Sequence, residues 1–184
     1  MSEAQSIQWY PGHMAKTKRK IEQDLKLVDA VAELVDARVP VSSRNPLLAT
    51  LIENKPRIIL LNKSDMADAA ETARWIAAYK QEGAWALAVD CKSGKGVNGF
   101  VPLVREALKD RIAQWEAKGM AGRAIRIMVV GIPNVGKSSL INKLTRGGKA
   151  EVEDRPGVTR QNRWFRVGKG MDLLDTRGVL WPKF

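Results

Sequence analysis

The feature that most constrains the fold is the octapeptide GIPNVGKS, from Gly131 to Ser138. It follows the apolar run IRIMVVG, which has the composition of a buried strand, and it leads into KSSLINKLT, which is expected to begin a helix. The spacing G-x-x-x-x-G-K-S between a strand and a helix is typical of a phosphate-binding loop. Glycines let backbone N–H groups face phosphate oxygens, and the helix N-terminus adds positive potential. The alternative, a chance glycine-rich turn, is disfavoured by this context.

Apolar runs alternate with amphipathic segments along the whole chain. This alternation predicts an α/β fold of three layers, in which a mostly parallel sheet of six strands has helices on both faces. The expected strands lie at 30–37, 57–65 including a closing turn, 84–90, 125–131, 164–168 and 171–175, and the expected helices at 14–29, 46–54, 71–83, 100–115 and 137–145.

The tetrapeptide NKSD, from Asn62 to Asp65, ends one of the apolar runs. A carboxylate at Asp65 can accept hydrogen bonds from both the N1–H and the exocyclic amine of guanine, and adenine offers no such pair of donors. Asn62 would brace the loop, and the stem of Lys63 would lie along the base. Alone, NKSD is more often a polar turn. Together with a phosphate loop it predicts selection of GTP over ATP.

Two more segments supply groups for a metal ion and a γ-phosphate. DTRG begins at Asp175, which would hold Mg²⁺ through water, and the N–H of Gly178 would reach the γ-phosphate. In PGVTR, the hydroxyl of Thr159 would join that of Ser138 as a Mg²⁺ ligand when GTP is bound. Lys137 would reach the β- and γ-phosphates, so Lys137 and Thr159 are expected to assist catalysis.

DCKSGKG, residues 90–96, follows another expected strand. Its backbone at Cys91 and Lys92 would approach the guanine carbonyl, although an ordinary Gly-Lys turn is an equal alternative. The residues expected to contact GTP are Asn62, Lys63, Asp65, Cys91, Lys92, Asn134, Val135, Gly136, Lys137, Ser138, Ser139, Thr159, Asp175 and Gly178.

The order of these motifs is unusual. An ordinary small GTPase has its phosphate loop first and N-K-x-D near its end, whereas NKSD comes first here. The motifs therefore predict a circularly permuted G domain over 1–184, in which helix 14–29 takes the place that normally follows D-x-x-G. Its expected parts are an N-terminal loop and basic helix (1–29), a guanine-recognition half (30–118) and a phosphate-loop and switch half (119–184).

Composition limits the setting and the partners. The 31 Lys and Arg exceed the 20 Asp and Glu, for a net charge of +11. This surplus favours a polyanionic partner, such as RNA, DNA or an acidic membrane, and a merely soluble basic protein is the alternative. One cysteine and one histidine exclude an internal disulfide and leave too few soft ligands for structural zinc. We expect a cytoplasmic protein, because the sequence shows neither a signal peptide nor an apolar run long enough to span a membrane. We also expect it to be a monomer.

The chain resembles the circularly permuted GTPases, and within them the ribosome biogenesis GTPase A family. The resemblance covers almost the whole chain and rests on WYPGHMAK (9–16), DARVPVSSRNP (36–46), NKSD (62–65), GIPNVGKSSLIN (131–142), PGVTR (156–160) and LLDTRGVLWPKF (173–184). It implies GTP hydrolysis coupled to late maturation of the large (50S) ribosomal subunit, with transient binding to the rRNA of the subunit precursor.

The chain departs from the family pattern in three ways. Arg177 stands where the D-x-x-G loop usually has proline, and DCK is not the usual base-loop sequence. The family carries a helical RNA-binding domain after the G domain, which is absent from these 184 residues. This leaves either a shortened form or an RNA affinity that rests on the G domain alone.

His13 is a candidate catalytic residue. Ordinary GTPases orient the attacking water with a Gln just after D-x-x-G, but Val179 stands there. The permuted order predicts that the loop around His13 is near the switch region, and the resemblance implies a catalytic role for this histidine. The alternative is a turn histidine that packs on its aromatic neighbours.

The resemblance also implies a K⁺ ion beside Asn134; a loop-bracing amide is the alternative there. Two functions remain open: a GTPase that is slow alone and stimulated by the ribosomal particle, or a GTP-dependent RNA- or ribosome-binding scaffold with negligible hydrolysis. Basic residues that would form an RNA face are Lys16, Lys18, Arg19, Lys20, Arg44, Lys118, Arg123, Arg126, Arg160 and Arg163.

Overall fold

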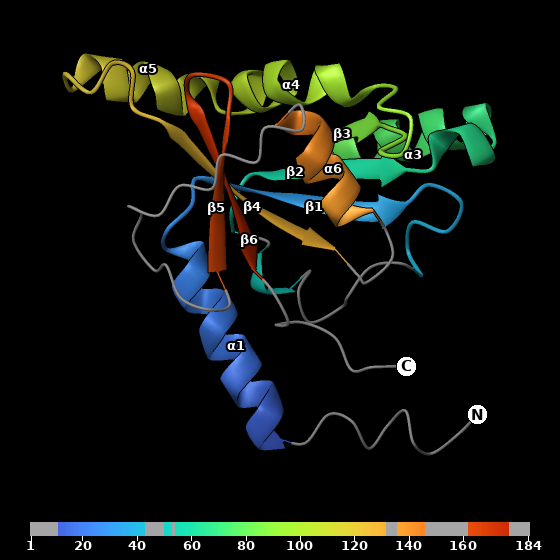
Figure 1. The fold of residues 1–184 in the computed structure, drawn as a ribbon, viewed down its shortest axis with the longest axis horizontal. Coiled ribbons are helices and arrows are strands. Elements are labelled where there is room, and N and C mark those ends of the chain that lie inside the picture. The colour runs from blue at the N-terminus through green and yellow to red at the C-terminus, as the bar shows by residue number, and fades with distance from the viewer. Residues whose placement is uncertain (1–10, 43–49, 53, 132–135, 146–161, 177–184) are drawn as a thin grey trace.

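The structure, a computed structural model, describes residues 11–42, 50–52, 54–131, 136–145 and 162–176, apart from the side chains of residues 11–14, 17 and 176. Within these ranges it contains one six-stranded sheet (Figure 1). The strands are β1 (Ala30–Asp36), β2 (Arg57–Asn62), β3 (Trp85–Ala88), β4 (Ile125–Gly131), β5 (Asn162–Val167) and β6 (Met171–Thr176). The α-helices are α1 (Pro11–Leu25), α3 (Ala69–Gln81), α4 (Phe100–Ala107), α5 (Lys109–Ala117) and α6 (Lys137–Leu144), and short 3-10 turns lie at Ser64–Met66 and Val97–Gly99.

The strand order is β3-β2-β1-β4-β6-β5, with every neighbouring pair parallel except the hairpin of β5 and β6. All seven residues of the central strand β1 are buried, as expected for a parallel strand covered on both faces. The predicted mostly parallel sheet of six strands is therefore confirmed.

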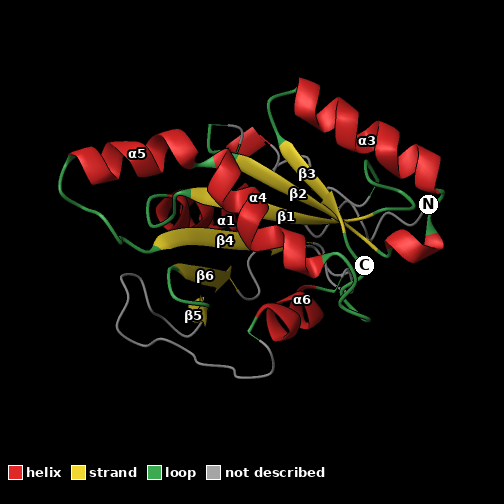
Figure 2. Ribbon diagram, turned by 90° about the horizontal axis from the view of Figure 1, so that it is seen from above, coloured by secondary structure: helices red, strands yellow, loops and turns green. Residues whose placement is uncertain are grey.

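Helices cover both faces of the sheet, which completes the three predicted layers (Figure 2). Side chains alternate along β1: Ala32 and Leu34 join one core cluster with Phe100 of α4 and Leu140 of α6. On the opposite face of the sheet, Val31 packs with residues of α1, and Val35 packs with residues of α3. Figure 1 shows α4 and α5 end to end along one side and α1 on the other.

Helix α3 is shifted by two residues from the predicted 71–83, and two other helices differ more from their predicted extents. Residues 100–115 were expected to form one helix, but Leu108 leaves the helical conformation (φ −107°, ψ 11°) and divides α4 from α5. The Leu108 N–H still donates to the Val104 carbonyl and the Ile112 N–H to the Leu108 carbonyl, so the break is a local bend with its hydrogen bonds intact. The other helix, α1, covers Pro11–Leu25 and not 14–29. It begins within the segment that was expected to be a loop, because proline fits the first turn of a helix.

Helix α1 is joined to the start of β5 by a buried polar cluster. Lys20 Nζ donates to both carboxylate oxygens of Asp24, at 2.9 Å each, and to Asn162 Oδ1 at 2.6 Å. The amide of Asn162 donates to Asp24 Oδ1 at 2.9 Å, and both Asp24 and Asn162 are 2% exposed. A buried charge needs such compensation, so the cluster fixes α1 against the end of the β5–β6 hairpin.

The predicted helix 46–54 lies mostly outside the described residues. Among those that the structure describes, no helix is both long and apolar enough to cross a membrane.

Candidate functional site

The parallel strands end at one edge of the sheet, and the predicted motifs follow those ends. From β1 the chain passes outward to β2 on one side, and β4 leads through α6 to the β5–β6 hairpin on the other. The boundary between β1 and β4 is therefore a topological switch point, where open α/β sheets form a ligand crevice. NKSD follows β2 and GIPNVGKS begins at the end of β4, on either side of this point.

A pocket of about 520 Å³ lies at this edge. It is bordered by residues from three separate stretches of the chain: Asn62, Lys63, Asp65, Met66, Asp90, Cys91, Lys92, Gly136 and Ser139. Seven of these nine residues, Ser139 included, were predicted to contact GTP. Met66 and Asp90 were not predicted.

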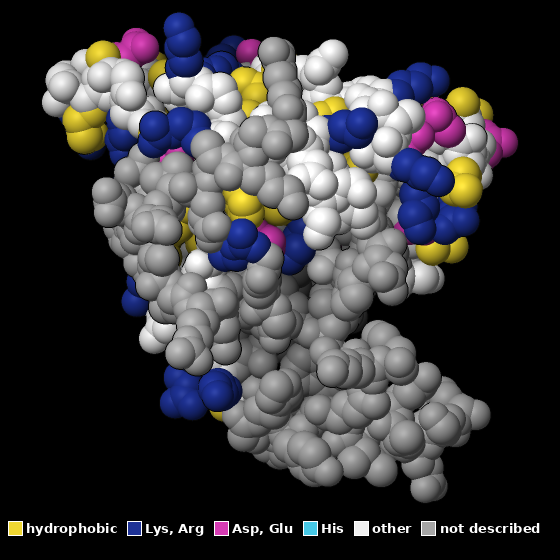
Figure 3. Space-filling model, viewed as in Figure 1, with side chains coloured by type: hydrophobic (Ala, Val, Ile, Leu, Met, Phe, Trp, Pro, Cys, Tyr) yellow, Lys and Arg dark blue, Asp and Glu magenta, His cyan; other side chains and the backbone are white. Residues whose placement is uncertain are grey.

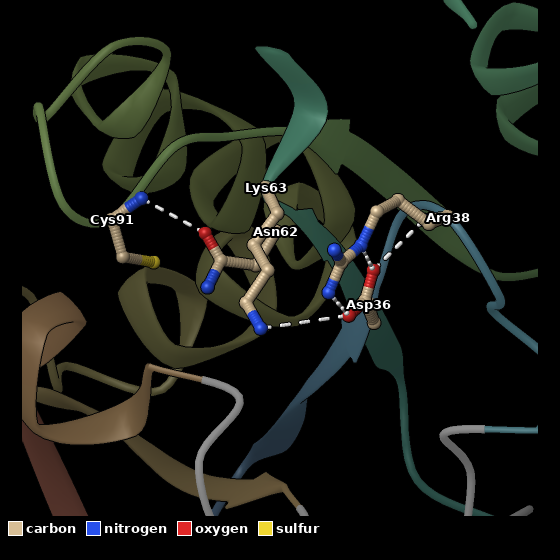
Figure 4. Close-up of polar contacts among 5 residues, drawn as sticks. All are labelled: Asp36, Arg38, Asn62, Lys63 and Cys91. Carbon is tan, nitrogen blue, oxygen red and sulfur yellow. Dashed lines mark hydrogen bonds and ion pairs between the residues drawn. The ribbon is translucent and has the colours of Figure 1, made fainter. Parts of the chain in front are cut away.

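Asn62 joins the base-recognition loops to the phosphate loop. Its side chain is buried, and Oδ1 accepts a hydrogen bond of 2.9 Å from the Cys91 N–H (Figure 4). On its other side, Nδ2 would lie only 2.5 Å from a Cβ placed on Gly136. Gly136 also has φ +102°, a conformation that side chains disfavour. Only glycine meets both conditions at position 136.

The base-recognition side of the pocket includes two carboxylates, those of Asp65 and Asp90. Asp65 is exposed and its Oδ1 lies 3.4 Å from Lys95 Nζ, a partner that sequence reasoning missed. Asp90 accepts from the Ser93 hydroxyl and the Lys92 N–H, at 2.8 and 3.1 Å. The Ser93 hydrogen bond is the main cause that lowers the pKa of Asp90 from its ordinary value, so this carboxylate is ionised at neutral pH.

The backbone N–H groups of Cys91 and Lys92, which follow β3, already have acceptors within the protein. The Cys91 N–H donates to Asn62 and the Lys92 N–H to Asp90, so both are engaged inside the protein. Both residues nevertheless line the pocket. Their approach to the guanine carbonyl stays a prediction.

The phosphate side is formed by the N-terminus of α6, which begins at Lys137. Lys137 Nζ lies 2.7 Å from Asp175 Oδ1 at the end of β6. That oxygen is buried, and its contact with Lys137 is an ion pair without hydrogen-bond geometry. Asp175 thus has a lone pair available, and with the exposed Ser138 hydroxyl it offers the hard oxygen ligands that Mg²⁺ prefers.

Several predicted site residues lie outside the described residues: Asn134, Val135, Thr159 and Gly178, together with the side chain of His13. The backbone of His13 belongs to the first turn of α1.

Known proteins are similar in sequence to nearly the whole chain. A family model described as 50S ribosome-binding GTPase matches residues 126–183. Over 178 residues the chain is 52% identical to ribosome biogenesis GTPase A of Bacillus licheniformis, an alignment that covers 97% of this chain and 63% of that protein. Identity to the protein of the same name from Priestia megaterium is 53% over 180 residues, covering 97% and 62%.

Among solved structures, GNP-bound YlqF from T. maritima has a TM-score of 0.60 at 30% identity and covers 92% of this chain and 60% of that one. The chain is a circularly permuted G domain similar to that of ribosome biogenesis GTPase A. The predicted resemblance and fold class are confirmed. This G domain spans less than two thirds of the length of the curated relatives that it matches.

Two charged residues of this G domain received no role of their own from the sequence. Asp36 and Arg38 entered only through the resemblance of the segment 36–46, and the structure places both beside Lys63 (Figure 4). Their position at the end of β1, next to the end of β2, was the available signal.

Gly136→Ala tests the contact between the two halves of the site. Gly119→Ala is the matched control, because Gly119 also has positive φ (+78°) but no atom within 4 Å of a Cβ. We expect the control to lose about 1 kcal/mol of unfolding free energy through backbone strain, and Gly136→Ala to lose about 1–3 kcal/mol more through overpacking. Urea denaturation measures both, and equal losses would contradict the close approach of Asn62.

Cys91 gives a pH-dependent probe of the same loop. Burial raises the pKa of the Cys91 thiol to about 12, and the nearby Asp90 charge adds to the effect. Because the thiolate is the reactive form, modification at pH 8 should be about 10³-fold slower in the folded than in the unfolded chain. The rate should rise with pH well beyond 9. Cys91 is the only cysteine, so a disulfide-exchange reagent reports on it alone; equal rates in native buffer and in denaturant would contradict its burial.

Proposed function

We propose that this G domain binds GTP and hydrolyses it to GDP and phosphate. The observation that carries the proposal is the contact of Asn62 with both Cys91 and Gly136, which joins a guanine-recognition loop to a phosphate loop 69 residues later in the chain. The bound nucleotide of the solved YlqF structures, which are GNP-bound and GDP-bound, supports it.

The names of the relatives support a role in ribosome assembly. We propose that the partners are the precursor of the large ribosomal subunit and its rRNA, and that the domain acts as a monomer in late maturation. A factor with this role would work in the cytoplasm, where we also place it.

Basic side chains are candidates for contacts with rRNA. Figure 3 shows Lys and Arg in separate groups, over α1, along α4 and α5, and toward α3. Several of the ten predicted residues have partners within the protein. Lys20 is bound to Asp24 and Asn162, and Arg123 pairs with Asp29 and lies over the Trp115 ring. Arg163 lies over the Phe165 ring, and Lys18 makes a surface pair of 4.0 Å with Glu22. Arg44 and Arg160 lie outside the described residues. The exposed Lys16, Lys18, Arg19 and Lys118 remain the better candidates.

Mg²⁺ would be held by Ser138 and Asp175, with Thr159 as the further ligand, and would neutralise charge on the β- and γ-phosphates. Lys137 rests on Asp175 in this structure. When nucleotide binds, Lys137 would exchange this carboxylate for phosphate oxygens, which frees Asp175 toward the metal. The two groups thus stabilise each other until the ligand arrives.

The placement of α1 supports a role for His13 in positioning the attacking water. Lys20, in the middle of α1, contacts Asn162, which pairs with Thr176 at the end of β6. His13 precedes Lys20 by seven residues, which is about 10 Å along a helix. The first turn of α1 therefore extends past the sheet edge on which DTRG begins, and Val179 leaves the usual water-orienting position without a polar side chain.

The proposed GTPase activity is tested by measuring the rate of GTP hydrolysis with and without large ribosomal subunits. We expect slow GTP hydrolysis alone and strong stimulation by the particle, because contact with the polyanionic partner would bring His13 toward the γ-phosphate. The contrasting function is a GTP-dependent scaffold, which Val179 favours. Tight GTP-dependent binding to the particle with no stimulation would establish that scaffold and reject the enzyme.

His13→Ala separates catalysis from binding. Loss of a group that positions water should lower turnover about 10²-fold or more, while the affinity for GTP is unchanged. Single-turnover hydrolysis on the particle and a nucleotide titration measure the two effects. A parallel loss of affinity and rate would assign His13 a structural role.

We propose K⁺ as a second activating ion, held by Asn134 beside the β- and γ-phosphates. It would add the positive charge that an arginine finger supplies in other GTPases. Turnover should be faster in KCl than in NaCl at equal ionic strength. Identical rates would show that Asn134 only braces the loop.

A further inference from the structure

The carboxylate of Asp36 lies between two cations, and one of these, Lys63, borders the pocket. Asp36 ends β1 directly beside Asn62, its register partner in β2. Arg38 holds it with three hydrogen bonds: the backbone N–H and Nε donate to Oδ1 at 2.9 and 3.0 Å, and Nη2 donates to Oδ2 at 2.7 Å. Lys63 Nζ lies 3.6 Å from the same Oδ2 (Figure 4). The Arg38 hydrogen bond is the main cause that lowers the pKa of Asp36, so this carboxylate stays ionised.

The backbone of Lys63 has an uncommon conformation. Its φ of 61° makes it the only residue other than glycine with positive φ in the part of the chain that the structure describes. This conformation costs a side-chain-bearing residue about 1–2 kcal/mol, and it persists only where the surroundings maintain it. Both neighbours are fixed: the Asn62 carbonyl accepts from the Ala37 N–H at 2.7 Å, and the Ser64 N–H donates to the Val89 carbonyl at 3.1 Å.

The side chain of Lys63 connects the pocket to Asp36. Lys63 lines the pocket with Asp65, and its ammonium group reaches Asp36 instead of pointing freely into solvent. A lysine held at its far end presents its methylene stem as a fixed apolar surface. A flat base placed against that stem meets a side chain whose rotamers are already restricted, which lowers the entropy cost of binding.

We propose that Asp36, oriented by Arg38, is a positioning residue for guanine-nucleotide binding and acts by holding the Lys63 side chain at the border of the pocket. This inference rests on the proposed binding of guanine nucleotides. It gives the DAR segment at the end of β1 a function of its own, in recognition of the base and not of the phosphates.

The test is a double-mutant cycle on GDP affinity. Asp36→Asn keeps the size of the side chain but removes its charge, and we expect the Kd for GDP to rise about tenfold, the size of effect given by loss of an interaction with a charged group. In a Lys63→Met background the same substitution should change the Kd less than twofold, because the group through which Asp36 acts is gone. Arg38→Gln, at a more exposed side chain, should raise the Kd by a smaller factor.

Asp172→Asn is the matched control. Asp172 is also a buried strand carboxylate with an arginine partner, since Arg166 Nε lies 3.3 Å from its Oδ1. It lies near the start of β6, however, whereas the site lies at the carboxyl ends of the strands. Its removal should lower the unfolding free energy without changing the Kd. If Asp36→Asn proves too unstable to measure, Arg38→Gln alone and in the Lys63→Met background completes the cycle.

Three outcomes decide the matter. An unchanged Kd in Asp36→Asn overturns the proposal, and so does an equal loss with and without Lys63, because Asp36 would then act independently of it. Equal losses in Asp36→Asn and Asp172→Asn would overturn it too, by showing a general effect of stability. Absence of GDP binding in the unaltered chain would instead contradict the proposed function, so the two failures are distinguishable.

Discussion

The site depends on a single amide, that of Asn62, which stands where three loops meet. One end of the amide accepts from the backbone that follows β3, and the other lies against the glycine that precedes α6. A buried amide has few ways to satisfy its polar atoms, so its geometry constrains every loop that it touches. The base-recognition and phosphate-binding segments are therefore held in a fixed relation without any direct covalent connection between them.

This dependence explains why the order of motifs along the chain can change without loss of the site. Parallel strands bring their carboxyl ends to one edge, whichever strand comes first in sequence. In this G domain β1, β2 and β3 precede the phosphate-loop strand β4, and the sheet still places β1 beside β4. What permutation alters is the location of the chain start, which places α1 against the hairpin of β5 and β6.

Charges buried around the sheet have specific partners that define how the elements meet. Lys20, Asp24 and Asn162 fix α1 to β5, and Asp29 joins the start of β1 to Arg123 and to the backbone of Arg126. Such groups are costly to bury and very costly to leave unpaired. They favour one packing of α1 over neighbouring ones, and with it one direction for the helix turn that contains His13.

Much of the fold was predictable, because the spacing of apolar residues and the composition of each segment indicate which residues are buried. The runs that became β1, β2 and β4 carry apolar residues on both faces, as expected for parallel strands covered on both sides. The bend at Leu108 was not predictable, since the helical period of the apolar residues continues across it. The start of α1 was misplaced because Pro-Gly is typical of turns, although proline also suits a first helical turn.

The sequence by itself determined the chemistry available to this protein: a phosphate loop, a carboxylate suited to guanine, hydroxyl and carboxylate oxygens suited to Mg²⁺, and a single histidine. Local spacing is enough for those inferences, because each motif acts through a few consecutive residues. Only the tertiary structure decided which side chains from distant strands support them, such as Asp36 under Lys63, Lys95 beside Asp65 and Asn62 against Gly136. These contacts follow from strand order and register, which arise from packing of the whole sheet and are not encoded in any one segment.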